Sequence, residues 1–214
     1  AMGAEVRSVL GNIVTVDLPV ARLEATLALD TVIYAEAARS TVLRLDRSVP
    51  ATKANQVWSG VANSFAGNTG KGVIVGIIDD GVDFRHQDFR NSNGTTRLLG
   101  LWDQRIAATG TPPAGFNYGK ECTVADLDAA ILGAAARCTQ PSSGGHGTHV
   151  AGIAVGNGSA TGAGQPANRF IGMAPEADIL AANSIAGGVG GNNAVLDAVA
   201  WMKAKAKAAG KPLV

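Results

Sequence analysis

The chain has 214 residues, which suffices for one large domain or for one domain with a small appendage. Hydrophobic residues make up 46% of it and charged residues only 16%, so it can bury a sizeable core. The formal net charge of +1 gives no reason to expect nucleic acid or a membrane surface as a partner. No apolar run approaches the roughly 20 residues that span a bilayer, and no signal peptide is visible.

The first 49 residues differ in pattern from the rest. Their predicted elements are strands at 6–10 and 13–16, a helix at 21–29, and short strand candidates at 32–34 and 42–45. Gly11-Asn12 is the predicted turn between the first two strands, and Pro19 opens the helix. The pattern predicts a small α+β appendage over residues 1–49, with a boundary near Pro50.

The second region, residues 50–214, begins with a predicted helical turn that ends near Trp58. Residues 73–78 form a continuous, largely β-branched apolar run, which suits a strand buried on both faces of a parallel sheet. Residues 91–145 are predicted to be irregular apart from one helix over 124–136. The elements predicted to follow are a helix at 146–155, a strand at 177–185, a helix at 192–208 and an apolar run that opens at 212.

This alternation of strands and helices predicts an α/β fold, a three-layer parallel sheet flanked by helices. Because the chain stops where a further strand would begin, we expect it to be an incomplete part of such a domain.

An acidic residue follows the first buried strand, in the sequence Ile77-Ile78-Asp79-Asp80-Gly81. A carboxylate at the end of such a strand lies at the carboxyl edge of the sheet, where α/β folds place their sites. The glycine allows the chain to turn sharply away from the strand.

The second motif places His146 after two glycines, at the start of a predicted helix of small residues. Small side chains let that helix approach the sheet closely, which would bring the His146 imidazole near Asp79. An Asp that accepts a hydrogen bond from an imidazole fixes its tautomer and leaves the other ring nitrogen free to take a proton from a nucleophile.

At these residues the sequence resembles the subtilisin-like serine protease (subtilase) family. Residues 77–81 match the family's aspartate motif, and residues 146–152 match its histidine motif almost residue for residue, in the family's chain order. The resemblance covers residues 50–214. The stretches 101–104 and 118–121 resemble an insertion between Asp and His in a bacterial, Csp-like branch of the family.

The resemblance implies a serine-type endopeptidase in which Asp79 orients His146 and His146 acts as general base and then general acid. Asp80 takes the place usually held by Ser or Thr, so it is not the triad acid. Residues 185–191 resemble the edge segment that pairs with the substrate backbone. The predicted substrate-binding residues in it are Gly187, Gly188, Val189 and Gly190.

The family's serine motif, Gly-Thr-Ser-x-Ala, does not occur among the 214 residues, and the family's oxyanion-hole Asn is missing as well. Ser142, Ser143 and Ser184 lack the motif and are interpreted as turn or strand-end serines. We therefore expect that this chain alone does not hydrolyse peptides.

Two alternatives remain open. The first is a non-catalytic, degenerate subtilase that binds peptides without cutting them. The second, less favoured, is a metal-dependent hydrolase, since metal-ligand residue types recur but the glutamate of His-Glu-x-x-His is absent. Those residues are Asp79, Asp80, Asp83, His86, Asp88, His146 and His149.

Cys122 and Cys138 could close a disulfide or remain two thiols, and the sequence does not decide between them. No metal site is predicted: the family binds calcium, but no ligands can be assigned here. The resemblance implies a polypeptide substrate, secretion, and a prodomain, which residues 1–49 resemble weakly, as a further partner; neither nucleic acid nor a membrane is expected.

Overall fold

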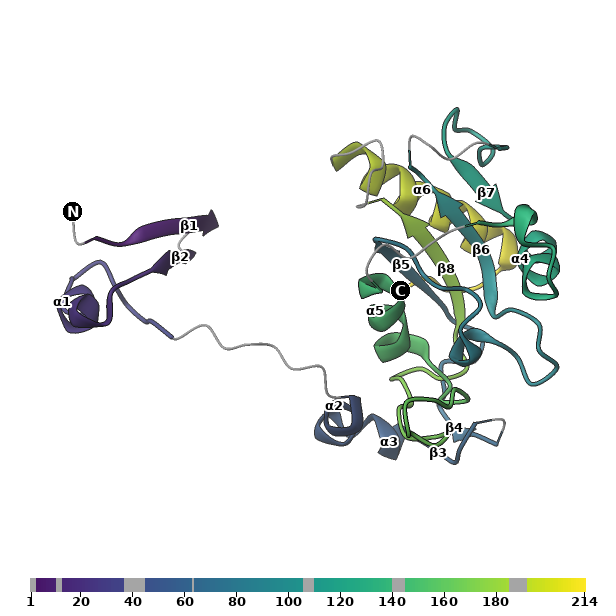
Figure 1. Cartoon of the computed structure of the whole chain (residues 1–214), viewed down its shortest axis with the longest axis horizontal. Coiled ribbons are helices and arrows are strands. Elements are labelled where there is room, and N and C mark those ends of the chain that lie inside the picture. Colours follow the sequence, from purple (N-terminus) through teal and green to yellow (C-terminus); the bar gives the residue numbers. More distant parts are fainter. Residues whose placement is uncertain are drawn as a thin grey trace. The chain divides into compact units, whose positions relative to one another are not determined.

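The computed structural model describes residues 3–10, 13–36, 45–62, 64–105, 110–139, 145–184 and 192–214. The chain divides into two compact units, Ala1–Leu43 and Arg44–Val214, which are considered separately (Figure 1). This division falls a few residues before the boundary that the sequence pattern predicts.

The first unit contains an antiparallel hairpin and a short helical segment. Its elements are β1 (Glu5–Leu10), β2 (Ile13–Asp17), η1 (Val20–Arg22) and α1 (Leu23–Leu27). The two strands and the helix are thus confirmed, but the strand candidate at 32–34 is wrong. The Val32 amide instead donates to Leu29 O in a turn, and Ile33 is 99% exposed, so no packed surface favours an extended pairing there. Residues 42–44 lie outside the described residues.

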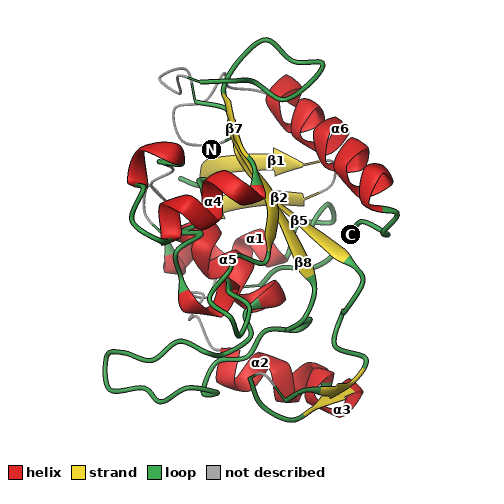
Figure 2. Cartoon of the chain, turned by 90° about the vertical axis from the view of Figure 1, so that its right-hand side faces the viewer, coloured by secondary structure: helices red, strands yellow, loops and turns green. Residues whose placement is uncertain are grey.

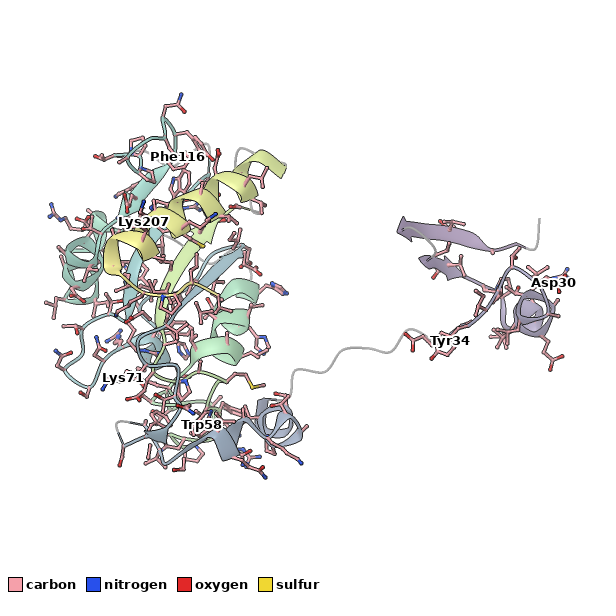
Figure 3. All side chains as sticks on the ribbon, turned by 180° about the vertical axis from the view of Figure 1, so that it is seen from behind. Asp30, Tyr34, Trp58, Lys71, Phe116 and Lys207 are labelled. Atoms are coloured by element: carbon pink, nitrogen blue, oxygen red, sulfur yellow. A yellow bond between two sulfur atoms is a disulfide. The ribbon has the colours of Figure 1, made fainter. Side chains whose placement is uncertain are left out.

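The second unit opens with α2 (Leu45–Thr52), α3 (Ala54–Val57) and the short antiparallel pair β3 (Trp58–Ser59) and β4 (Ala66–Gly67). Leu45 therefore begins a helix, not the predicted strand. Trp58 is buried, packs its ring edge-on against Phe65, and donates from Nε1 to Met173 O at 3.0 Å. Figure 3 shows Trp58 and Phe116 at opposite ends of this unit.

A four-stranded sheet forms the centre of the second unit. Its strands are β5 (Ile74–Asp79), β6 (Leu98–Asp103), β7 (Lys120–Cys122) and β8 (Asp178–Asn183), in the order β5-β8-β6-β7. β8 pairs in parallel with β5 and β6, and β7 is an antiparallel edge strand. Leu213 bridges Ile74 in parallel on the other side of β5.

The expectation that residues 91–145 are irregular outside one helix is wrong, because β6 and β7 lie in this stretch. Gly100 interrupts the apolar run of β6 at a shift in the register with β8. A Cβ at this position would lie 3.3 Å from the Trp201 ring, so glycine permits a close approach of the strand to that ring. Such a packing requirement cannot be recognised from local sequence.

Helices cover both faces of the sheet (Figure 2). On one face, α4 (Val124–Ile131) and α5 (His146–Val155) contribute to a core that includes Ile77, Leu101 and Ile179. On the other face, α6 (Asn192–Ala209) packs Trp201 and its neighbours against Ile74 and Leu180. Successive residues of each parallel strand thus enter opposite cores, which confirms the three-layer α/β arrangement.

The helix predicted over 124–136 ends earlier, at Ile131, and is followed by η3 (Ala135–Arg137). A disulfide joins Cys122, at the end of β7, to Cys138, directly after η3, and both residues are buried. The disulfide therefore joins the segment that contains α4 and η3 to the edge strand of the sheet. Among the described residues, no helix is both long enough and apolar enough to cross a bilayer.

Candidate active site

Asp79 is the last residue of β5 and lies at the carboxyl edge of the parallel strands. It is only 8% exposed, and its Oδ1 accepts a hydrogen bond from the Asp80 amide at 2.7 Å. Gly81 then adopts φ +120°, a conformation that side-chain-bearing residues rarely reach. The strand end thus presents one restrained, hydrogen-bonded carboxylate and turns sharply away from it.

His146 is the first residue of α5 and faces that carboxylate. Its Nδ1 lies 2.8 Å from Asp79 Oδ1. Its side chain is 73% exposed while that of Asp79 is 11% exposed, so the ring extends outward from a largely buried partner. The hydrogen bond with Asp79 is the main cause that raises the pKa of His146, and the charges of Asp79 and Asp80 raise it further.

A glycine next to His146 makes this approach possible. A Cβ on Gly147 would lie 2.3 Å from Gly81 O and 2.9 Å from Asp79 Cβ, far inside van der Waals contact. The backbone of the first helical turn therefore lies directly against the turn that follows Asp79. This agrees with the expectation that small residues let the helix approach the sheet.

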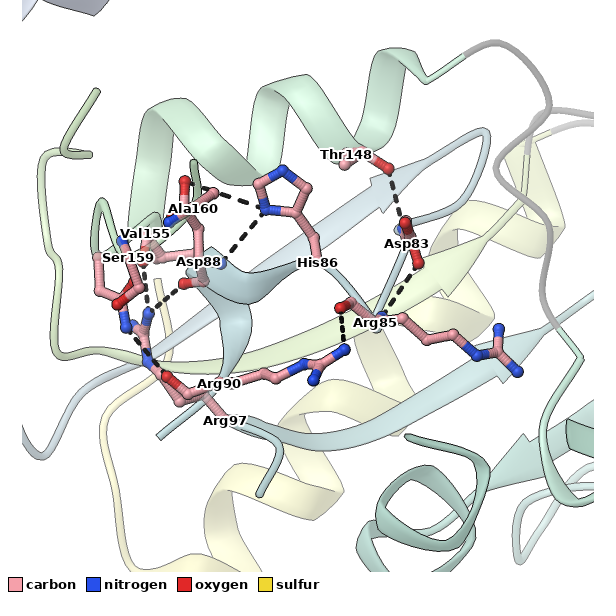
Figure 4. Close-up of polar contacts among 11 residues, drawn as sticks. Asp83, Arg85, His86, Asp88, Arg90, Arg97, Thr148, Val155, Ser159 and Ala160 are labelled. Carbon is pink, nitrogen blue, oxygen red and sulfur yellow. Dashed lines mark hydrogen bonds and ion pairs between the residues drawn. The ribbon is translucent and has the colours of Figure 1, made fainter. Parts of the chain in front are cut away.

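Two hydrogen bonds join α5 to the turn after β5. The Gly147 amide donates to Asp80 Oδ1 at 2.7 Å, and the Asp83 amide donates to the Thr148 hydroxyl at 2.8 Å, as Figure 4 shows for the second. The sequence alone predicted no such role for Asp80 or Thr148. The partners are more than sixty residues apart, so no local spacing could have indicated the contacts.

At its far end, α5 is held by a buried arginine. The guanidinium of Arg97 donates to Asp88 O at 2.9 Å, Val155 O at 2.8 Å and Ala177 O at 2.5 Å (Figure 4 labels Arg97, Asp88 and Val155). Burial lowers the pKa of Arg97 to about 10, an effect that the nearby carboxylate of Asp178 opposes. Arg97 thus connects the loop after Asp79, the last residue of α5 and the segment before β8.

The side chains of His86 and Asp88, at η2 (Gln87–Phe89), accept hydrogen bonds from backbone amides. His86 Nδ1 accepts from the Asp88 amide at 3.3 Å, and Asp88 Oδ1 accepts from the Ala160 amide at 2.7 Å. Within the described ranges, no three His, Cys, Asp or Glu side chains converge as a metal site would require. The metal-dependent alternative therefore has no candidate ligand set in this part of the chain.

Of the predicted site residues, the structure brings Asp79 and His146 together. Gly187, Gly188, Val189 and Gly190 lie outside the described residues, as do Ser142 and Ser143. The Ser184 hydroxyl hydrogen-bonds to Gln104 Oε1 in a buried position, so it is engaged within the fold.

A mainly parallel sheet between two helical layers, with an Asp–His hydrogen bond at its carboxyl edge, defines an α/β protein with an acid–imidazole pair. The family model described as "Subtilase family" matches residues 70–209, and the chain belongs to this family of serine proteases.

Two individual relatives are also named as proteases. The chain is 28% identical over 160 residues to "Minor extracellular protease Vpr" of Bacillus subtilis (strain 168), covering 75% of this chain and 15% of that protein. It is 31% identical over 121 residues to "PII-type proteinase" of Lacticaseibacillus paracasei, covering 52% of this chain and 6% of that protein. The chain thus spans a small part of both relatives.

A solved structure has a similar fold. The structure of the Clostridium perfringens CspB protease matches with a TM-score of 0.58 and 20% identity, covering 80% of this chain and 31% of that one. The match supports the subtilisin-like fold class, and the expected insertion of a Csp-like branch stays a prediction.

Proposed function

We propose that this chain supplies the acid and the base of a serine endopeptidase triad, Asp79 and His146. The observation that carries the proposal is the 2.8 Å contact between Asp79 Oδ1 and His146 Nδ1, with the remainder of the imidazole exposed. A buried carboxylate that binds one ring nitrogen leaves the other facing outward, which is the arrangement that a proton acceptor for a hydroxyl nucleophile needs.

In this mechanism Asp79 remains ionised and accepts the Nδ1–H bond of His146. The bond selects the tautomer whose Nε2 carries a lone pair, and the carboxylate stabilises the imidazolium that forms when Nε2 takes a proton. Asp79 is suited to this role because the Asp80 amide also donates to its Oδ1 and holds the carboxylate in one orientation.

His146 then carries the proton through the reaction. Its Nε2 takes the serine hydroxyl proton as that oxygen attacks the peptide carbonyl, and returns the proton to the departing amine. Water repeats the cycle to release the acyl group. The Gly-Thr-Ser-x-Ala motif that carries the nucleophile does not occur among the 214 residues, so this polypeptide by itself supplies only the proton-transfer half of the site.

The substrate of the proposed enzyme is a polypeptide. Residues 187–190 are proposed to pair with its backbone as an added strand, and residues 1–49 to act as a prodomain. Secretion is proposed because a relative is named an extracellular protease. Calcium is not assigned to any residue.

The proposal is tested by hydrolysis of a fluorogenic peptide. The 214-residue polypeptide is expected to show no turnover, because it contains no nucleophile motif and no oxyanion-hole Asn. Turnover that His146→Ala abolishes would contradict this expectation.

The sequence of the coding region downstream of codon 214 would distinguish the proposed protease from the alternative, a peptide-binding module without catalysis. If it encodes Gly-Thr-Ser-x-Ala, the longer polypeptide should cleave the peptide, and Asp79→Asn should lower kcat by about 10⁴-fold, as loss of a triad acid does elsewhere. If it does not, peptide binding without cleavage is the function expected.

A further inference from the structure

The N-cap residue of α5 supplies no side-chain cap. Gly145 stands at the N-cap position in a left-handed conformation and offers no side chain to the first turn. The first amides of a helix have no partners within the helix, so another group must satisfy them. For the amide of Gly147, that group is the Asp80 carboxylate, which accepts at 2.7 Å from a distant part of the chain.

Asp80 also lies next to the acid of the site. Its own amide donates to Asp79 Oδ1, while its side chain accepts from Gly147, the residue after His146. One residue thus connects the carboxylate of the proposed pair to the backbone that carries its imidazole. Because Asp80 makes both contacts, it links the position of the helix start to the position of the Asp79 carboxylate.

We propose that Asp80 is a positioning residue for the Asp79–His146 pair, capping α5 in place of a local residue and placing a second negative charge beside the imidazole. This inference rests on the proposed function, since it assigns Asp80 to the same site. A carboxylate suits both roles of Asp80, the capping of α5 and the placement of charge. A negative charge at a helix N-terminus is favourable, and hydrogen bonds from amides to a carboxylate are strong.

The surroundings of His146 allow the two effects to be measured separately. Asp79 and Asp80 are the groups that raise its pKa, Asp79 chiefly through the hydrogen bond and Asp80 through charge alone. Other titratable or charged groups near α5 are His149 of the helix itself, His86 and Asp88 around η2, Asp83 in the turn after β5 and Arg97 at the far end of the helix. An Asn at position 80 keeps an oxygen that can accept from Gly147 but removes the charge, whereas Ala removes both.

The test follows the 214-residue chain by NMR, with Asp80→Asn and Asp80→Ala compared with the parent. Asp80→Ala is expected to speed exchange of the Gly147 amide about fivefold, the change that corresponds to a cap of about 1 kcal/mol. Asp80→Asn is expected to speed it less. Both variants are expected to lower the titration midpoint of His146, because both remove the charge.

Asp126→Asn is the matched control. Asp126 accepts from Thr123 in the capping box of α4, so this variant also removes a carboxylate from a helix start. It is expected to leave the Gly147 exchange and the His146 midpoint unchanged. Unchanged values of both in folded Asp80→Ala would overturn the proposal; if that variant does not fold, an unchanged His146 midpoint in Asp80→Asn overturns it.

These readouts need no peptide hydrolysis. A protein that proves not to be a peptidase would still show them, and a failure of the Asp80 proposal would leave the Asp79–His146 contact in place. The two proposals therefore fail on different measurements.

Discussion

The guanidinium of Arg97 donates to the carbonyl oxygen of Val155 at 2.8 Å, at the last residue of the helix whose first residue is His146. The same side chain binds Asp88 O in the loop that follows Asp79. The two segments that contribute the proposed acid and base are thus joined a second time, at the opposite end of α5 from the imidazole.

Replacing this arginine should therefore destabilise the second unit. Arg97→Met removes the guanidinium donor from three carbonyl oxygens, of which Asp88 O keeps the Asn157 amide as a donor. We expect the free energy of unfolding to fall by roughly 2–4 kcal/mol. Arg97→Lys should lose less, since an ammonium group can satisfy part of the cluster. Urea denaturation measures the effect, with Lys71→Met at an exposed lysine as the control. A loss no larger than that of the control would contradict this role of Arg97.

Two glycines of α5 should respond oppositely to alanine. Gly147→Ala places a methyl group 2.3 Å from Gly81 O, so the helix start must move away, at a cost of about 1–3 kcal/mol. Gly152→Ala meets nothing within 4 Å and should stabilise the chain by about 0.5–1 kcal/mol through helix propensity. Thermal unfolding compares the two, and equal effects of the two substitutions would show that the close approach is not tight.

The pH dependence of His146 should reveal its partner. In the folded chain its pKa is raised above 6.5, first by the hydrogen bond to Asp79. The stabilising contribution of the protonated pair is therefore complete below about pH 6.5 and is lost as the pH rises through the raised value. Asp79→Asn should lower the NMR titration midpoint of His146. A midpoint unaffected by this substitution would show that the two side chains do not interact in solution.

The raised pKa of His146 also determines the expected pH profile of catalysis in a polypeptide that carries the serine motif as well. A general base must be neutral, so hydrolysis should fall as the pH drops through the raised pKa of His146. The dependence of kcat/KM on pH measures this limb. A limb set by His146 should move to lower pH in Asp80→Asn and remain in place in Asp126→Asn.

The disulfide should stabilise the excursion between β7 and η3. Cys122 and Cys138 are 16 residues apart, and closing a loop of this length contributes about 3 kcal/mol in the chain-entropy account. The Cys122→Ser/Cys138→Ser double variant should lose stability by about that amount, and dithiothreitol should lower the Tm of the parent but not of the variant. A parent Tm insensitive to reductant would argue against the bond.

The central strands β5 and β8 and the Asp79–His146 pair could be predicted from the sequence, because their signals are local. The run that ends at Asp79 is apolar and β-branched apart from Gly76, as suits a strand between two helical layers. The small residues after His146 indicate a helix in close contact with the sheet. Both features can be predicted from residue types that are adjacent in the sequence.

The remaining features depend on contacts across the fold. β6 was not predicted, and Gly100 within it is explained only by the Trp201 ring against it. The bond from Gly147 to Asp80 and the three carbonyl partners of Arg97 likewise join distant segments. The strand candidate at 32–34 had suitable residue types but found no partner, which shows that propensity alone does not make a strand.

The bridge between Leu213 and Ile74 places a second hydrogen-bonding neighbour beside β5. Ile74 donates to Pro212 O and Gly76 donates to Val214 O, while β8 occupies the other side of the strand. Sliding β5 by one residue would break ladders on both sides and would turn the Asp79 carboxylate toward the opposite helical layer, out of reach of the imidazole. Hydrogen bonds on both sides of β5 therefore fix the direction in which the Asp79 carboxylate points.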